Sequence, residues 1–288
     1  MAFSDERDAA HHLTHIGYYR LTSYWLPYEA DHASHAFKDG TRFEDVIRHY
    51  SFDRDLRLLL MDAIERVEIA VRTRWVFVMV EAHGTHAHLD PTLFATKSGK
   101  NGTSIWDHSK GCADLRKEHD RSQETWVKHF RSKYDEPLPP LWASCELMTL
   151  GAFSKWYKYT AQSGLRNKVA RSFGIDEAVL ASFLHHISVV RNICAHHARL
   201  WNRNFTLILT LPKRPGTLGS SLNTNDVRKI YNTLTMLAFL LDSICPSSSW
   251  RRRVLECMAR YEIDPTQMGF PANYRETVIW KIVGIMPT

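Results

Sequence analysis

Residues 190–203 read "VRNICAHHARLWNR" and bring arginine, asparagine and histidine side chains into one short stretch. Histidine is the side chain whose ordinary pKa lies near neutrality, so it can accept and donate protons at neutral pH. The arginine guanidinium is a fixed cation whose several donors suit phosphate oxygens. The stretch therefore has the side chains needed for proton transfer beside a bound anion.

The same stretch lies at the end of a long helical pattern. After Asp176, a preferred N-cap residue, the chain runs without proline or glycine, which predicts a helix over about 177–203. On a helical wheel this segment has an apolar stripe and a polar, basic face. The polar face carries His185, Asn192, His196, Arg203 and, just beside them, Arg199. His197 projects about 100° away from His196.

Arg191 is the exception, because the wheel places it about 20° from Leu180, inside the apolar stripe. A buried guanidinium needs a paired carboxylate or a bound anion. Glu65 and Glu68, within the helical pattern at 52–81, are the candidate structural partners. On the residues alone, two interpretations stay open: a structural ion pair beside a solvated histidine face, or an anion-binding site.

Composition narrows the class of protein. The 288 residues are 44% hydrophobic, enough for a large core, and 37 Lys and Arg against 31 Asp and Glu give a net charge of +6. This mild excess favours a polyanionic partner without requiring one. The five cysteines are odd in number and widely spaced, which argues against a disulfide framework. We find no signal peptide or membrane-spanning run and expect a soluble, cytoplasmic protein with no membrane partner.

The elements that position these side chains are predicted to be helical. Residues 52–81 repeat apolar side chains at three-to-four spacing and predict a long helix at the centre of the core. We expect one elaborated domain over 1–288. The other predicted elements are helices over 6–16, 113–134, 141–160, 226–244 and 249–262, a polar excursion over 84–112, and a strand or extended chain over 205–212.

A metal site is not expected. His11 and His15 stand one helical turn apart, and "HAH" at 86–88 is a second group, but neither has the cysteine or carboxylate complement of a tetrahedral zinc site. The chain also has no HExxH motif and no complete phosphate-binding GxxxxGK[ST] loop. We therefore expect neither a metal ion nor a small-molecule cofactor.

Five segments carry a resemblance to a known family. Besides "VRNICAHHARLWNR", they are "HIGYYRLTSYW" at 15–25, "FDRDLRLLLMDAIERVEIAVRT" at 52–73, "LPPLWASCELMTLGAFSKWY" at 138–157 and "MGFP" at 268–271. Within "VRNICAHHARLWNR", the string "RNICAH" is similar to the Rx4-6H motif of the HEPN superfamily. The content and order of the five segments resemble the Abi family of abortive-infection proteins, the AbiD and AbiF group, over nearly the whole chain.

This resemblance implies an all-α, HEPN-like helical bundle with additional helices and loop excursions, and a role in bacterial defence against phage. HEPN proteins are commonly metal-independent endoribonucleases that dimerise, so that two motifs form one composite site. On this basis His196 is the expected acid or base, Arg191 the phosphate clamp, and Asn192 the residue that orients His196 or the phosphate. RNA and a second copy of the chain are the expected partners.

Metal-free cleavage of RNA needs a base for the ribose 2′-hydroxyl, an acid for the leaving 5′-oxygen and cations for the developing phosphate charge. Histidine and arginine supply all three. The competing hypothesis is a noncatalytic RNA-binding or effector-regulating module that keeps the HEPN fold for assembly. Some AbiF-like members are associated with a small noncoding RNA, and that RNA is then the expected ligand.

Further RNA contacts are expected from basic and aromatic side chains near the motifs. Aromatic rings stack on unpaired bases, and arginines follow the phosphate backbone. Members of the family usually carry a further N-terminal segment before the tyrosine-rich motif, whereas this sequence starts only some 14 residues ahead of it. Two readings stay open: RNA or partner contacts are weakened, or the start is misassigned. Besides Tyr24 and Trp201 for stacking, the candidates are His185, His197, Arg199, Arg203, Tyr18, Tyr19, Arg20, Arg251 and Arg252.

Overall fold

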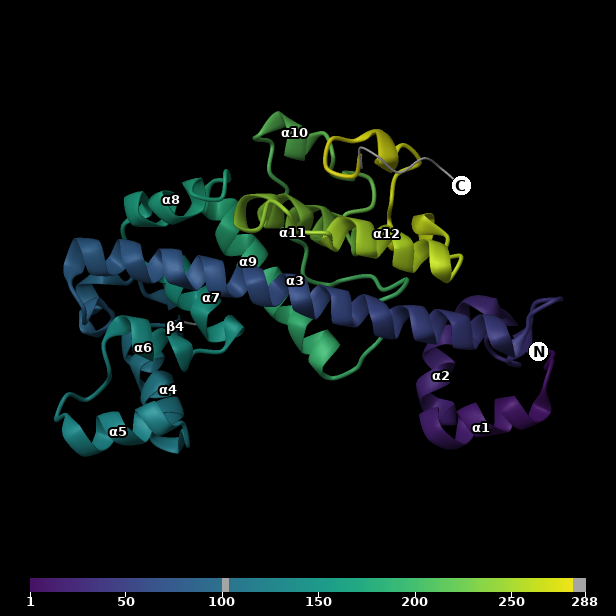
Figure 1. Ribbon diagram of the computed structural model, residues 1–288, viewed down its shortest axis with the longest axis horizontal. Coiled ribbons are helices and arrows are strands. Elements are labelled where there is room, and N and C mark those ends of the chain that lie inside the picture. Colours follow the sequence, from purple (N-terminus) through teal and green to yellow (C-terminus); the bar gives the residue numbers. More distant parts are fainter. Residues whose placement is uncertain (100–103, 282–288) are drawn as a thin grey trace.

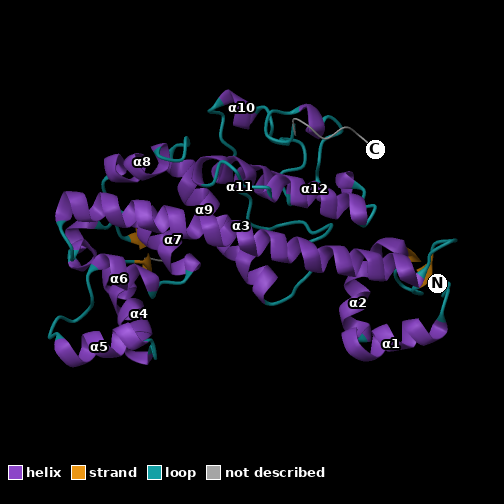
Figure 2. Ribbon diagram, in the orientation of Figure 1, coloured by secondary structure: helices purple, strands orange, loops and turns teal. Residues whose placement is uncertain are grey.

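The computed structural model describes residues 1–99 and 104–281, and its architecture is all-α, as the sequence predicts (Figures 1 and 2). In chain order, the helices are α1 (Glu6–Ile16), α2 (Tyr18–Trp25), α3 (Phe43–His83), α4 (His108–Arg121), α5 (Thr125–Lys133), α6 (Leu141–Glu146), α7 (Leu150–Tyr159), α8 (Ser163–Arg171), α9 (Glu177–Ala195), α10 (Gly216–Gly219), α11 (Tyr231–Ile244) and α12 (Trp250–Arg260). Two small antiparallel pairs join β1 (Glu29–Asp31) to β2 (Ala36–Phe37) and β3 (Lys97–Ser98) to β4 (Ser104–Trp106).

The long helix α3 is the spine of the fold. Its 41 residues span about 60 Å, and it begins earlier than the predicted 52–81 because Phe43 and Val46 continue the buried stripe. Figure 1 shows α1 and α2 near one end of α3 and α4 to α7 toward the other. Helices α2, α6, α7, α8, α9, α11 and α12 all contact α3. The predicted central position of this segment is confirmed by its buried residues, which include Leu56, Leu60, Val67, Val71, Trp75 and Val78.

Helix α9 is the second core element, and it packs against α3, α7 and α8. Within residues 1–99 and 104–281, it is the helix whose length and hydropathy alone would allow it to cross a membrane. Half of that apolar stretch is buried inside the molecule. His186 within it is only 3% exposed, and its ring lies 2.9 Å from the Leu207 carbonyl and 2.8 Å from Thr233 Oγ1. This burial is typical of the core helix of a soluble protein.

Some predicted helices are interrupted. The segment 113–134 divides into α4 and α5, and the segment 141–160 divides into α6 and α7. The second break is made by Thr149, whose hydroxyl accepts a hydrogen bond from Ala152 N at 3.1 Å and starts a new helix. Residues 205–212 are extended chain without a strand. The predicted excursion over 84–112 contains short 3₁₀ turns, β3, β4 and the start of α4, and its residues 100–103 lie outside the described part.

Two glycines in neighbouring helices have opposite surroundings. A Cβ added to Gly111 in α4 would lie 2.9 Å from ring atoms of both Trp106 and Trp156, whereas one added to Gly151 in α7 would meet nothing nearer than 3.9 Å. We expect Gly111→Ala to lower the free energy of unfolding by about 1–3 kcal/mol through overpacking. We expect Gly151→Ala to raise it by up to about 1 kcal/mol through helix propensity. Urea unfolding of both variants checks this, and equal effects would contradict the packing of α4.

The buried His186 makes stability depend on pH. Burial lowers its pKa from the ordinary value of 6.5 to about 4. Between these two values the unfolded chain binds a proton that the folded chain does not, so stability falls as the pH drops from about 6.5 to about 4. The loss at pH 4 amounts to about 3 kcal/mol. We expect the free energy of unfolding of His186→Gln to fall less steeply over this interval; an unchanged slope would contradict the assignment.

Candidate functional site

The motif helix α9 begins as predicted and ends earlier. Asp176 caps it by accepting a hydrogen bond from Val179 N at 2.9 Å. The last helical residue is Ala195, and His196 is the C-cap. The prediction of a continuous helix to about residue 203 is therefore wrong, and so is the single polar face that it implied.

A left-handed residue ends α9. His197 has φ of 55°, a conformation usually taken by glycine at this position. Its N–H donates to Cys194 O at 3.0 Å, and Ala198 N–H donates to Ile193 O at 3.0 Å, which is the Schellman arrangement of a helix C-terminus. Because no glycine stands here, the sequence carries no sign of this end.

The chain after α9 is anchored by a buried carboxylate on α3. Asp53 is fully buried and accepts hydrogen bonds from Leu200 N at 3.0 Å, from Trp201 N at 2.6 Å and from the Tyr24 hydroxyl at 2.7 Å. It also forms an ion pair with Arg57, which is 6% exposed. Burial raises the pKa of Asp53, and these donors oppose the shift because they stabilise the carboxylate. The anchor holds the turn after α9 against α2 and α3.

The anchored turn and α2 enclose a cleft of about 750 Å³. Its walls come from two segments about 180 residues apart in the sequence, at 16–24 and 196–203. Within the described part of the chain, no aspartate or glutamate lines it. Eight of the residues proposed from the sequence meet here: Tyr18, Tyr19, Arg20, Tyr24, His196, His197, Arg199 and Arg203.

The three arginines of this cleft are held by backbone carbonyls. Arg20 donates to His197 O at 2.8 Å, Arg199 donates to Ser23 O at 2.8 Å, and Arg203 donates to Arg199 O at 3.2 Å. Burial lowers the pKa of the half-buried Arg199, but a guanidinium stays charged at neutral pH. Each guanidinium keeps further N–H donors, so the cleft can bind an anion without rearranging its walls.

The aromatic candidates divide into exposed and buried rings. Tyr18 is 60% exposed and Tyr19 is 88% exposed at the cleft, so both are open to a ligand. Tyr24 and Trp201 are each 1% exposed. The expectation that Tyr24 and Trp201 stack on bases is wrong, because both rings are buried and lie nearly parallel to each other, with centroids 6.5 Å apart.

Arg191 and Asn192 lie outside this cleft. Arg191 is exposed and does not lie in a buried stripe, although Val190 and Cys194 in the same turns of α9 are buried. Its charge lowers the pKa of Glu68, although burial of Glu68 raises that pKa overall, and Glu68 forms its ion pair with Arg72. Asn192 and His185 line a different cavity, between α4, α7 and α9. The motif residues are thus divided between two sides of α9.

The basic cluster on α12 is part of the surface and not of the cleft. Arg251 pairs with Asp242 at 3.0 Å and donates to Ile279 O at 2.6 Å. Arg252 pairs with Glu256 at 3.6 Å. Neither residue lines the cavity that holds His196, and a contact of Arg251 or Arg252 with RNA elsewhere on the surface stays a prediction.

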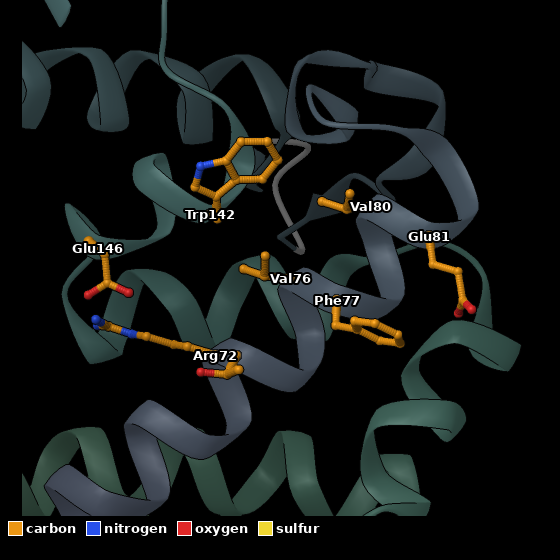
Figure 3. A pocket seen from close by; sticks show the side chains of 8 residues that line it. Arg72, Val76, Phe77, Val80, Glu81, Trp142 and Glu146 are labelled. Carbon is orange, nitrogen blue, oxygen red and sulfur yellow. The ribbon is translucent and has the colours of Figure 1, made fainter.

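Two other features bear on ligand chemistry. An apolar cavity of about 440 Å³ lies where α6 meets the C-terminal half of α3, lined by Val76, Phe77, Val80 and Trp142 (Figure 3). None of the predicted site residues lines it, and its apolar walls do not suit a polyanion. Across residues 1–99 and 104–281, no group of three or more histidine, cysteine, aspartate or glutamate side chains is arranged to hold a metal ion.

The anchoring role of Asp53 can be tested by removing its charge. We expect Asp53→Asn to lower the free energy of unfolding by about 3–5 kcal/mol, because the substitution leaves the buried Arg57 cation without a counter-charge. Asp55→Asn, two residues along α3, loses pairs with the exposed Arg54 and Arg260 and weakens a hydrogen bond from Tyr261. It should cost about 1 kcal/mol. Equal losses in urea unfolding would show that Asp53 is not the anchor.

Comparison with known proteins identifies the family. A family model described as Abi-like protein matches residues 11–202, two thirds of the chain. The matched region contains every residue of the α2 cleft except Arg203. Comparison with curated proteins found no match, and comparison with solved structures found none. The chain therefore belongs to the Abi-like protein family, a membership that points to a role in abortive-infection defence.

Proposed function

We propose that this Abi-like protein is a metal-independent endoribonuclease that acts in abortive-infection defence against phage. One observation carries the proposal: three arginines and two histidines converge on one cleft, and within the described residues no carboxylate lines it. A cleft lined by cations and by no carboxylate within the described residues favours a polyanion, and the net charge of +6 favours the same class of ligand. The exposed Tyr18 and Tyr19 at its edge suit contacts with unpaired bases.

The proposed reaction is transfer of a phosphodiester within RNA. A base removes the proton of the ribose 2′-hydroxyl, and the 2′-oxygen forms a bond to the adjacent phosphorus. The bond from phosphorus to the 5′-oxygen breaks, and an acid protonates the leaving oxygen. His196 acts as acid or base, and His197 is the second imidazole within the cleft. Arginine donors stabilise the negative charge that grows on the phosphate oxygens.

A second copy of the chain completes the proposed site. Arg191 is exposed near the end of α9 and forms no salt bridge within the described residues, so its guanidinium is open to another molecule. Arg191 and Asn192 do not line the cleft that contains His196 in the same chain. A twofold arrangement would bring the motif of one copy to the cleft of the other, with Arg191 as phosphate clamp and Asn192 as orienting residue.

A second candidate function rests on the distance between the motif residues within one chain. Since Arg191 and Asn192 lie apart from His196, the cleft also suits a noncatalytic module that binds RNA, such as a small noncoding RNA, without cutting it. In that case the wild-type protein binds RNA and leaves it intact. The charge reversal Arg203→Glu would then weaken RNA binding and make the RNA affinity depend less steeply on the salt concentration.

Cleavage in the presence of EDTA distinguishes the two functions. We expect the purified protein to cut total bacterial RNA in EDTA, and we expect His196→Ala to lower the rate by at least about 10²-fold, because one proton transfer is lost. His129→Ala, an exposed histidine on α5 that does not line the cleft, is the matched control and should keep the wild-type rate. Equal rates for the His196→Ala variant and the wild type would refute the assignment of His196. Intact RNA bound by both proteins would establish the noncatalytic module.

A further inference from the structure

A second cleft lies on the other side of α9 from the one that holds His196. It encloses about 500 Å³ between α4, α7 and α9, a size within the range of about 300–1,000 Å³ typical of small-molecule sites. In Figure 1 the end of α9 projects between the α4 to α7 group and the α1 and α2 pair. The lining includes Trp106, Leu115, Lys117, Met148, Thr149, Lys155, Trp156, His185, Ser188 and Asn192.

The floor of this cleft is apolar and partly aromatic. Trp106 and Trp156 meet edge to face, with ring centroids 5.6 Å apart, and Leu115 and Met148 lie beside them. All four side chains are nearly fully buried, so they present fixed edges to the cavity. Gly111 keeps α4 close to both indoles, since any side chain there would collide with them. The face of Trp106 is stacked on Tyr159, with ring centroids 4.8 Å apart, so a ligand ring in the cleft would meet the edges of the two indoles.

The wall formed by α9 offers hydrogen-bonding groups that the protein leaves unused. Ser188 donates its hydroxyl to His185 O at 2.7 Å, but in the described part of the chain the side chains of His185 and Asn192 have no hydrogen-bond partner. Burial, together with Lys158 and Lys155, lowers the pKa of His185, so its ring is neutral at neutral pH and offers one donor and one acceptor. The Asn192 amide also offers both, which matches the edge of a nucleobase.

The rim of the cleft supplies cations. Lys117 on α4 and Lys155 on α7 line it, and neither forms a salt bridge within the described residues. Of the two acidic residues at the rim, Glu118 is already paired with Arg121 at 2.7 Å, which leaves Asp114 as the open carboxylate. Two open ammonium groups against one open carboxylate favour an anionic group at the mouth of the cleft.

We propose that the cleft between α4, α7 and α9 binds a nucleoside phosphate. The base lies on the floor formed by Trp106 and Trp156, its polar edge bonds to Asn192 and His185, and its phosphate is held by Lys155 and Lys117. A free nucleotide and one nucleotide of an RNA strand share this chemistry. The site shares Asn192 with the proposed composite catalytic site, but it contains neither His196 nor any other residue of the α2 cleft, so binding there is expected to survive His196→Ala.

The probes are the four 5′-mononucleotides AMP, GMP, CMP and UMP, and 2′-O-methyl pentanucleotides of the same four bases, which lack the 2′-hydroxyl needed for cleavage. Dissociation constants are measured by calorimetry on the full chain. We expect at least one mononucleotide or pentanucleotide to bind the wild type. Lys155→Glu and Gly151→Met should each weaken it at least about tenfold, because the first reverses a phosphate contact and the second places a side chain in the cavity.

Lys168→Glu, the same charge reversal at an exposed position on α8, is the matched control and should bind as the wild type does. Thermal unfolding of Gly151→Met checks that the blocked protein is folded; the space around the Cβ position predicts that it is. A pentanucleotide that binds at least tenfold tighter than its mononucleotide identifies RNA as the source, and the reverse order identifies a free nucleotide. Affinities that Lys155→Glu and Gly151→Met leave at the wild-type value, or no binding by any probe, would overturn the proposal whether or not the protein cleaves RNA.

Discussion

The buried carboxylate of Asp53 is the interaction on which the arrangement of the cleft depends. Its donors come from α2, from α3 and from the chain after α9, so one side chain fixes three segments that are distant in the sequence. A buried charge is tolerated only when donors surround it, and the donors must therefore stay in place. Apolar packing alone would let α2 slide against the turn, whereas charge-assisted hydrogen bonds with Tyr24 and the backbone of Trp201 are directional.

The helices could largely be predicted from the sequence, because the spacing of apolar residues indicates their buried faces and glycine or capping residues mark their ends. The apolar repeat of α3 and the end of α1 at Gly17 are both confirmed. The end of α9 could not be predicted, because His197 takes a left-handed conformation without glycine. For the cleft, the sequence predicts many of the lining residues but not how they come together. The assembly of the cleft depends on Asp53, and an aspartate four residues before an arginine usually indicates an exposed helical pair.

Helix α9 contributes side chains to two clefts of different character. The turn after it faces α2, where all the charged lining residues of the described part are cationic. Its last two turns face α4 and α7, where the cleft has an apolar floor and a rim of lysines and carboxylates. The first cleft suits a repeating backbone charge and the second suits a single shaped ligand. Asn192 O accepts the His196 N–H at 2.9 Å, so one turn of backbone belongs to both clefts. A shift of this turn would therefore change the shape of both clefts together.

The conformation of His197 has an evolutionary consequence. Glycine takes the left-handed conformation without steric cost, whereas a side chain there costs on the order of 1 kcal/mol. Glycine or asparagine at this position would relieve that cost, so stability alone favours either residue over histidine. A lineage that retains the imidazole in spite of that bias is under selection for the ring itself, and not for the turn that it terminates.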